Sequence, residues 1–142
     1  MFKNRTSPWK ENNGKIETKK QDDSEATLCQ LIEREDGKIV WEQDAENIYN
    51  RFRAFLPWPG VYTFWKNNDS VVRIKILQMK LQKNNPGTKH SVGEVFEIGE
   101  SIGVQTINGV IILKEIQLEG KEPIEIKTFL NGYKNFIGSI LF

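Results

Sequence analysis

The sequence predicts a mainly β fold in which short helices flank a small, curled antiparallel barrel. Three observations support this prediction. About five stretches in the second half alternate between apolar and polar residues, which is the period of half-buried strands. An Asn108-Gly109 pair stands between the last two stretches, and this pair is typical of a β-hairpin. An amphipathic helical pattern precedes the first stretch.

The predicted first helix begins after Asp44, a residue type that favours the position before a helix. Its apolar residues recur every three or four positions and form one face: Ala45, Ile48, Tyr49, Phe52 and Phe55. Pro57 ends the helix. We expect Phe52, Phe55 and Tyr62 to point inward and Arg51 and Arg53 to point outward.

A constrained corner follows the helix in the run R-A-F-L-P-W-P-G-V-Y-T from Arg53 to Thr63. Pro57 and Pro59 each fix φ near −65° and remove an amide donor, and both favour extended geometry in the residue before them. Gly60 supplies the freedom to leave the corner as a strand. We expect the corner to hold Trp58 where its ring covers the end of the core or meets a ligand.

The predicted strands are Val61–Trp65, Val71–Leu81, Val95–Ile98, Ile102–Thr106 and Val110–Leu118. The alternation in the second strand slips near Ile76 and Leu77, which indicates a bulge or a sharp curl. The Asn108-Gly109 pair predicts a type I′ turn. A second short helix is expected at Ile124–Gly132, with Gly132 as its stop. Five curled antiparallel strands with a capping helix resemble an OB-type barrel.

Residues 1–41 are interpreted as a linker or tail with short extended segments, and residues 42–142 as the barrel domain. The first 23 residues are polar and expected to be poorly ordered. Ala26–Ile32 is too short for periodicity to distinguish a strand from a helical turn. Ile39–Trp41 is expected to be extended. The sequence contains no apolar run near the roughly 20 residues that span a bilayer. It has a single cysteine, so no internal disulfide can form, and a cytoplasmic location is expected.

The charges are unevenly distributed although the net charge is only +1. Residues 66–90 hold six Lys or Arg against Asp69, whereas residues 91–126 hold seven Glu against two Lys. A basic half of this kind either attracts a phosphate backbone or simply solvates exposed strand faces. The crowd of aromatic residues between Phe52 and Trp65 is, likewise, either a core cluster or a stacking surface for RNA.

No catalytic constellation is recognisable in the sequence. His90 lies in a polar loop and is expected to be solvated, without a nucleophile nearby. Cys29 lacks a CxxC partner and the histidine spacing of a zinc site. No phosphate-cradling glycine loop is present. We therefore expect neither catalytic residues nor a metal.

Several segments together resemble the C-terminal domain of methionyl-tRNA formyltransferase. They are P-W-P-G-V-Y-T at the corner, N-P-G-T at 85–88, N-G-V-I-I-L-K-E-I-Q-L-E-G-K-E-P at 108–123 and F-L-N-G at 129–132. Q-D-D-S-E-A-T from Gln21 and E-D-G-K-I-V-W ending at Trp41 resemble the linker that joins this domain to the catalytic domain. The likeness covers roughly residues 14–142.

The resemblance implies an OB-like barrel that presents basic groups to initiator Met-tRNA, as part of an enzyme that formylates the methionine in translation initiation. The catalytic residues and the pocket for 10-formyltetrahydrofolate would belong to an N-terminal domain that this sequence lacks, so no cofactor is expected here. The positions that fit tRNA contact are Arg34, Lys38, Arg51, Arg53, Arg73, Lys75 and Lys80. A catalytic domain in trans is a further candidate partner, whereas a membrane or DNA is not expected.

Two other hypotheses remain open at this point. The chain is alternatively a structural or interaction module of a formyltransferase that acts on nucleotide sugars or folate and does not bind tRNA. This alternative gains support if Arg51, Arg53, Arg73, Lys75 and Lys80 do not share a face. An enzyme that works alone is the third hypothesis, and the missing catalytic constellation argues against it.

Overall fold

The computed structural model describes residues 22–84 and 90–142, and the contacts divide the chain into two units, 1–31 and 32–142. In the first unit, the carboxylate of Asp22 accepts a hydrogen bond from the amide of Ser24 and caps a 3₁₀ turn, η2 (Asp23–Glu25). Residues 26–31 are exposed and form neither of the two expected structures. The predicted tail at 1–21 and the loop at 85–87 lie outside the described residues.

The second unit contains the sheet and its helices. Its elements are η3 (Glu35–Gly37), α1 (Ala45–Ala54), β1 (Val61–Asn67), β2 (Ser70–Gln82), β3 (Val95–Ile98), β4 (Ser101–Gln105), β5 (Val110–Leu118), β6 (Ile124–Glu125), α2 (Ile126–Gly132) and η4 (Lys134–Phe136). The strands pair in the order β1-β2-β5-β4-β3, every neighbour antiparallel, and β6 pairs with β5. The predicted fold class, a mainly β, OB-like antiparallel barrel with short flanking helices, is confirmed. The predicted boundary between residues 41 and 42 stays a prediction.

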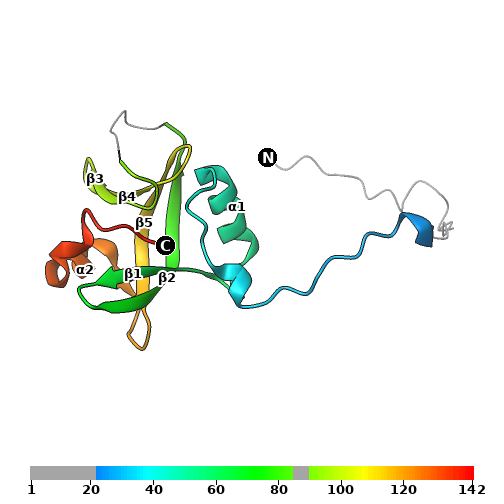
Figure 1. Cartoon of the computed structure of the whole chain (residues 1–142), viewed down its shortest axis with the longest axis horizontal. Coiled ribbons are helices and arrows are strands. Elements are labelled where there is room, and N and C mark those ends of the chain that lie inside the picture. The colour runs from blue at the N-terminus through cyan, green and yellow to red at the C-terminus, as the bar shows by residue number, and fades with distance from the viewer. Residues whose placement is uncertain (1–21, 85–89) are drawn as a thin grey trace, which may run out of the picture. The chain divides into compact units, whose positions relative to one another are not determined.

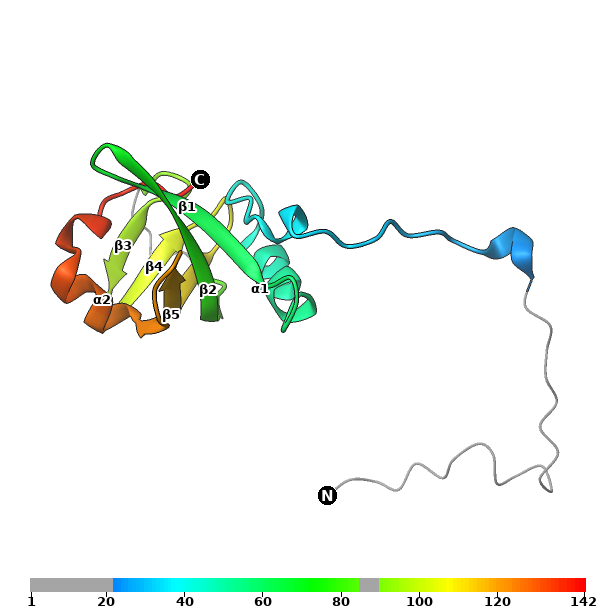
Figure 2. The same ribbon diagram turned by 90° about the horizontal axis from the view of Figure 1, so that it is seen from below.

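The core lies inside the curl of this sheet. Side chains of α1, α2 and the five strands β1 to β5 meet there, with Trp41, Trp65, Phe129 and Phe136 among the largest. The indole of Trp65 meets the rings of Phe129 and Phe136 edge to face. The helices α1 and α2 lie at opposite ends of the curled sheet in Figure 1 and Figure 2. A smaller apolar cluster on the other face of the sheet joins Phe96 to residues of β5.

The last residues of the chain connect the two outer strands of the sheet. Leu141 donates its amide to the carbonyl of Gly93, next to β3. Phe142 exchanges two backbone hydrogen bonds with Phe64 of β1, at 2.9 and 3.1 Å. Residues 138–142 therefore span the gap between β3 and β1 and close the curl. This arrangement covers backbone groups that an edge strand would otherwise expose.

The bulge predicted in the second strand is confirmed. The register between β2 and β5 shifts at Gln78, between Ile76 and Met79. The slip lets Ile76 and Met79 both face the core although they are three residues apart. The extra residue also increases the local curl, which a small barrel requires.

Two details of the predicted elements are wrong. The hairpin at residues 106–109 is not a type I′ turn, because Gly109 has a positive φ of 93° and Asn108 does not. The second helix begins at Ile126, since Ile124 pairs with Ile116 as part of β6. The predicted end of this helix at Gly132 is confirmed, and the chain leaves through Tyr133 at a φ of −132°, without a left-handed glycine.

The first helix begins after Asp44 as predicted, but its capping differs. The Asp44 side chain makes no capping hydrogen bond. The amide of Ala45 instead donates to the carbonyl of Asn108 at 3.0 Å, so the β4–β5 hairpin satisfies one of the free amides of the helix. The tertiary contact thus replaces the local one.

Candidate functional site

A groove of about 390 Å³ lies on the outer surface of β1, β2 and the turn after β5. The residues that line it are Arg34, Trp58, Pro59, Val61, Tyr62, Arg73, Lys75, Gln117, Leu118, Glu119 and Gly120. Three of the seven predicted contact residues therefore meet in one place. Its aromatic and cationic lining is suited to a ligand with both a flat ring and negative charge.

The strand register explains why these side chains share the groove. Along β1, residues at alternate positions are buried, so the side chain of Tyr62 lies on the outer face. Tyr62 is paired with Lys75 of β2, and Lys75 with Gln117 of β5. The inward orientation expected for Tyr62 is therefore wrong: its neighbours Val61 and Thr63 fill the core instead.

Each cation of the groove has a distinct environment. The guanidinium of Arg73 lies over the Tyr62 ring, 5.5 Å from its centroid, and donates to the Glu119 carboxylate at 2.8 Å. Arg34 and Lys75 have no ion pair among the described residues. Both side chains are exposed, so their charges remain available to a ligand. The groove holds three cations and one carboxylate.

The proline corner forms one wall of the groove. The amide of Gly60 donates to the carbonyl of Phe55 at 2.9 Å and closes the corner. Gly60 has a φ of 76°, and a Cβ there would come within 2.8 Å of Lys75 Cε. The glycine therefore lets the aliphatic part of Lys75 pass close to the corner. Trp58 does not cover the core; its ring is 56% exposed at the groove.

The segment before α1 is held against the corner from two sides. A Cβ at Gly37 would collide with the carbonyl oxygen of Gly60, so the two backbones are in direct contact. The guanidinium of Arg51 donates twice to the carbonyl of Asp36, at 2.6 and 3.0 Å. These contacts place Arg34 at the groove. Arg51 therefore positions the segment and does not point outward to solvent as expected.

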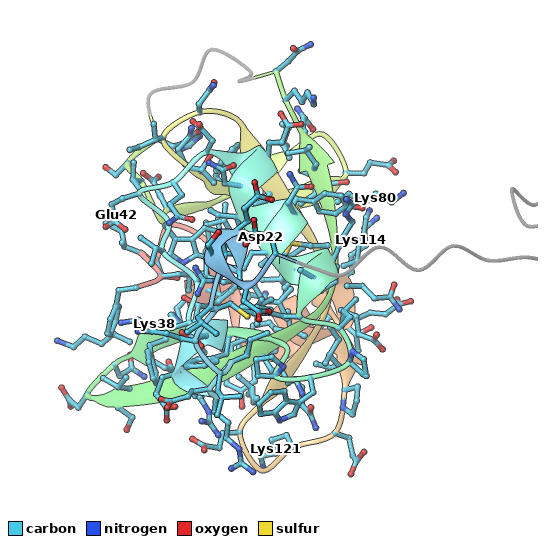
Figure 3. The ribbon with its side chains drawn as sticks, turned by 90° about the vertical axis from the view of Figure 1, so that its right-hand side faces the viewer. Asp22, Lys38, Glu42, Lys80, Lys114 and Lys121 are labelled. Carbon is cyan, nitrogen blue, oxygen red and sulfur yellow. The ribbon has the colours of Figure 1, made fainter. Side chains whose placement is uncertain are left out.

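The remaining predicted contact residues lie outside the groove lining. The ammonium of Lys38 is 5.5 Å from the centre of the Phe64 ring, which packs edge to face on Tyr62. Arg53 is exposed and lies over Tyr49 of α1. Lys80 follows the bulge, and Figure 3 shows it on the opposite flank from Lys38. Only Arg34, Arg73 and Lys75 therefore gather at the groove, and the seven predicted contact residues do not share a single face.

Sequence reasoning missed Tyr62, Gln117 and Glu119. The alternation along β1 already placed Tyr62 on the face opposite Val61 and Thr63, so the signal was present. Gln117 and Glu119 gave no local signal, because only the pairing of β5 with β2 brings them to Lys75 and Arg73.

His90, which lies away from the groove, also differs from its expected environment. Its side chain is only 23% exposed, and the ring stacks on Phe96 at 3.9 Å. Its Nδ1 lies 2.9 Å from a carboxylate oxygen of Glu94, and the amide of Ser91 donates to the other at 2.7 Å. The hydrogen bond to His90, and then that to Ser91, hold the pKa of Glu94 below its usual value. Phe96 comes close only through the fold, so the loop sequence predicts a solvated side chain wrongly.

The described residues hold no group of three or more His, Cys, Asp or Glu arranged to bind a metal ion. Cys29 is exposed as a free thiol. Within the described part of the chain, no helix is long and apolar enough to cross a membrane.

A family model described as the formyl transferase C-terminal domain matches residues 31–134, so the chain belongs to this family of domains. Among its relatives are enzymes named methionyl-tRNA formyltransferase. The one from Caldicellulosiruptor saccharolyticus is 40% identical over 123 residues, which cover 86% of this chain and 38% of the relative. Those from Treponema denticola and Geotalea daltonii are 35% and 34% identical, over 82% and 92% of this chain. The chain spans less than two-fifths of the length of each of these relatives.

Proposed function

We propose that this chain is the tRNA-binding C-terminal part of a methionyl-tRNA formyltransferase. In this proposal the groove between Arg34, Arg73 and Lys75 receives the phosphate backbone of initiator Met-tRNA. The observation that supports it most is the convergence of these three cations on one surface, from segments that are distant in sequence. The names of the relatives supply the nucleic-acid partner.

The environment of the cations suits a phosphate ligand. Arg34 and Lys75 have no ion pair to break among the described residues. The Arg73–Glu119 pair is about half exposed on both sides, and pairs of this kind contribute about 1 kcal/mol or less. A phosphate group therefore competes with Glu119 at little cost. Lys38 and the ring of Phe64 extend the same surface along β1.

The whole enzyme, in this proposal, transfers a formyl group from 10-formyltetrahydrofolate to the methionine of initiator tRNA for translation initiation in the cytoplasm. This chain contributes tRNA binding. The folate and the catalytic groups are assigned to a separate catalytic domain, which is the expected partner in trans. We expect no formylation of Met-tRNA by the chain alone.

The test is a titration of initiator tRNA into the chain at 50 and 200 mM salt. Arg34→Ala/Lys75→Ala removes two groove charges, and Lys127→Ala/Lys134→Ala removes two exposed charges outside the groove as a matched control. Binding of the unchanged chain is expected to weaken by roughly threefold per phosphate contact over this range. The groove variant should lower the slope of log K against log salt by about two, and the control should not.

One observation favours a second function, that of a structural or interaction module that does not bind tRNA. Among the predicted contact residues on α1 and β2, only Arg73 and Lys75 line the groove, and Arg51 donates to the carbonyl of Asp36. Equal affinities for the groove variant and its control would support this second function. Salt-independent binding would contradict the phosphate mechanism.

A further inference from the structure

Trp58 is an exposed indole in a rigid setting. Trp41 and Trp65 are 2% and 1% exposed, whereas Trp58 is 56% exposed. It stands between Pro57 and Pro59, in a corner closed by a backbone hydrogen bond and pressed against the segment before α1. A large aromatic surface left in water costs free energy that burial in the core would recover. The fold keeps this ring at the groove instead.

The neighbours of Trp58 define what the ring can bind. Arg34, Arg73 and Lys75 line the same groove, and Tyr62 adds a second aromatic side chain. The volume of about 390 Å³ is within the range of pockets that hold small ligands. Cations beside an aromatic face suit a flat, π-bonded ring that has a phosphate attached. An unpaired nucleotide has this combination, whereas a regular duplex offers phosphates but keeps its base faces stacked inside.

We propose that Trp58 is a stacking platform for one unpaired base of the RNA whose phosphates the groove binds. The inference rests on the proposed function and deepens it, because it names an unpaired nucleotide as the ligand of this wall of the groove. The cations supply affinity that depends on salt, and the indole supplies a preference for single-stranded over double-stranded RNA. Arg34 and Lys75 act on the phosphates, and Trp58 acts on the base.

Four ligands separate these contributions. They are a short single-stranded RNA, the same strand with abasic sites, a duplex of the same length, and the mononucleotide. The protein has Trp9→Phe throughout, so that position 9 contributes no tryptophan fluorescence. The part of the ligand-induced fluorescence quenching that is lost in Trp58→Phe then reports the indole at position 58. Trp58→Ala should weaken binding of the single strand by roughly tenfold and leave the abasic strand and the duplex unchanged. Trp58→Phe should restore most of the affinity, because phenylalanine also stacks.

Leu56→Ala is the matched control, since Leu56 is a 47% exposed apolar residue of the same corner and does not line the groove. It should leave all affinities unchanged. Equal loss for the single strand and the abasic strand in Trp58→Ala would overturn the stacking role while phosphate binding stands. If the mononucleotide binds as tightly as the single strand, the proposal that the ligand is RNA is contradicted. If none of the four ligands binds the unchanged chain, the proposed function fails as well.

Discussion

Thr63 connects three distant parts of the molecule through one buried hydroxyl. It is fully buried, and its oxygen accepts a hydrogen bond from the Trp41 indole at 3.0 Å. It donates in turn to the carbonyl oxygen of Phe142 at 3.3 Å. Replacing the hydroxyl by a methyl group keeps the volume and leaves the indole N–H without its acceptor.

We expect Thr63→Val to lower the free energy of unfolding by about 1–3 kcal/mol, because a buried donor loses its partner. Urea unfolding at neutral pH measures this change. Thr106→Val offers a comparison, since its buried hydroxyl donates to the Gly109 carbonyl within a single hairpin. A double-mutant cycle with Trp41→Phe should show a coupling of at least 0.5 kcal/mol. Additive effects would mean that the hydroxyl and the indole do not depend on each other.

Glu94 makes the stability depend on pH in the acid range. Its folded-state pKa lies below the usual value of 4.5, chiefly because His90 donates to the carboxylate. Protonation therefore favours the unfolded chain. The contribution is complete above about pH 4.5 and is lost as the pH falls through the folded-state pKa.

We expect Glu94→Gln to flatten this dependence. Urea unfolding at pH 6 and pH 3 should show a smaller loss on acidification for the variant than for the unchanged chain. Glu97→Gln, an exposed residue of β3, is the control and should behave like the unchanged chain. If Glu94→Gln and Glu97→Gln lose the same stability on acidification, the carboxylate near His90 is not the source of the pH dependence.

At this scale the sequence predicts which residue types matter better than it predicts what they contact. Arg51 was expected to point to solvent, and Tyr62 to point into the core. The arginine error arises because its partner Asp36 lies on a segment whose placement depends on the whole fold. The tyrosine error has a local cause, because the alternation of β1 already placed Tyr62 on the outer face. Arg34, Arg73 and Lys75 are among the predicted contact residues and line one groove, but their role in binding stays a prediction, and nothing local indicated that Glu119 would join them.

At the scale of elements, residues 138–142 form backbone hydrogen bonds with β1 and with the residues around β3, as a strand between them would. Leu141 is 2% exposed and belongs to the main core, whereas Phe142 is 48% exposed. The two neighbouring residues therefore contribute differently. Leu141 closes the barrel through the burial of its apolar side chain, whereas Phe142 contributes through its backbone pairing.

We expect Leu141→Ala to destabilise the fold by about 2–4 kcal/mol, through lost burial and the cavity left behind. Phe142→Ala should cost about 1 kcal/mol or less, because its ring is half exposed and its backbone bonds remain. Thermal unfolding of the two variants compares them directly. A cost for Phe142→Ala as large as that for Leu141→Ala would show that the aromatic contact with Phe64, not core burial, holds the segment.

Local sequence patterns were sufficient to predict most helices and strands, but they were insufficient to predict how residues 138–142 close the barrel. The alternation of β2, with its slip, was enough to predict the bulge, because register and side-chain face are tied together in a strand. The two residues of β6 were merged into α2, since two residues carry no period of their own. The pairing of residues 138–142 with β1 and β3 was not predicted, because it joins positions far apart in the chain.

For the whole molecule, we expect the balance of charge in the groove to affect the proposed tRNA binding more than the net charge of +1 does. Glu119 is the only carboxylate among the described residues that line it, and its partner Arg73 is a proposed phosphate contact. Removing that negative charge frees the arginine and weakens repulsion of the ligand.

We expect Glu119→Gln to strengthen tRNA binding at 50 mM salt, by about two- to fivefold. Glu122→Gln, an exposed glutamate outside the groove lining, controls for the change in net charge and should have a smaller effect. The two affinities are measured in the same titration. Weaker binding of Glu119→Gln would mean that the carboxylate orients Arg73 for the ligand.

The closure by residues 138–142 also has a kinetic consequence. The hydroxyl of Thr63 and the carbonyl of Phe142 that bond in the folded state are 79 residues apart. Contacts of such long range are slow to form, because the entropy of closing the loop is lost before the contact is gained. During synthesis, β1 leaves the ribosome long before the segment that covers its edge. The nascent chain therefore exposes one unpaired edge of β1 until residues 138–142 emerge, and this interval is when it is most prone to aggregate.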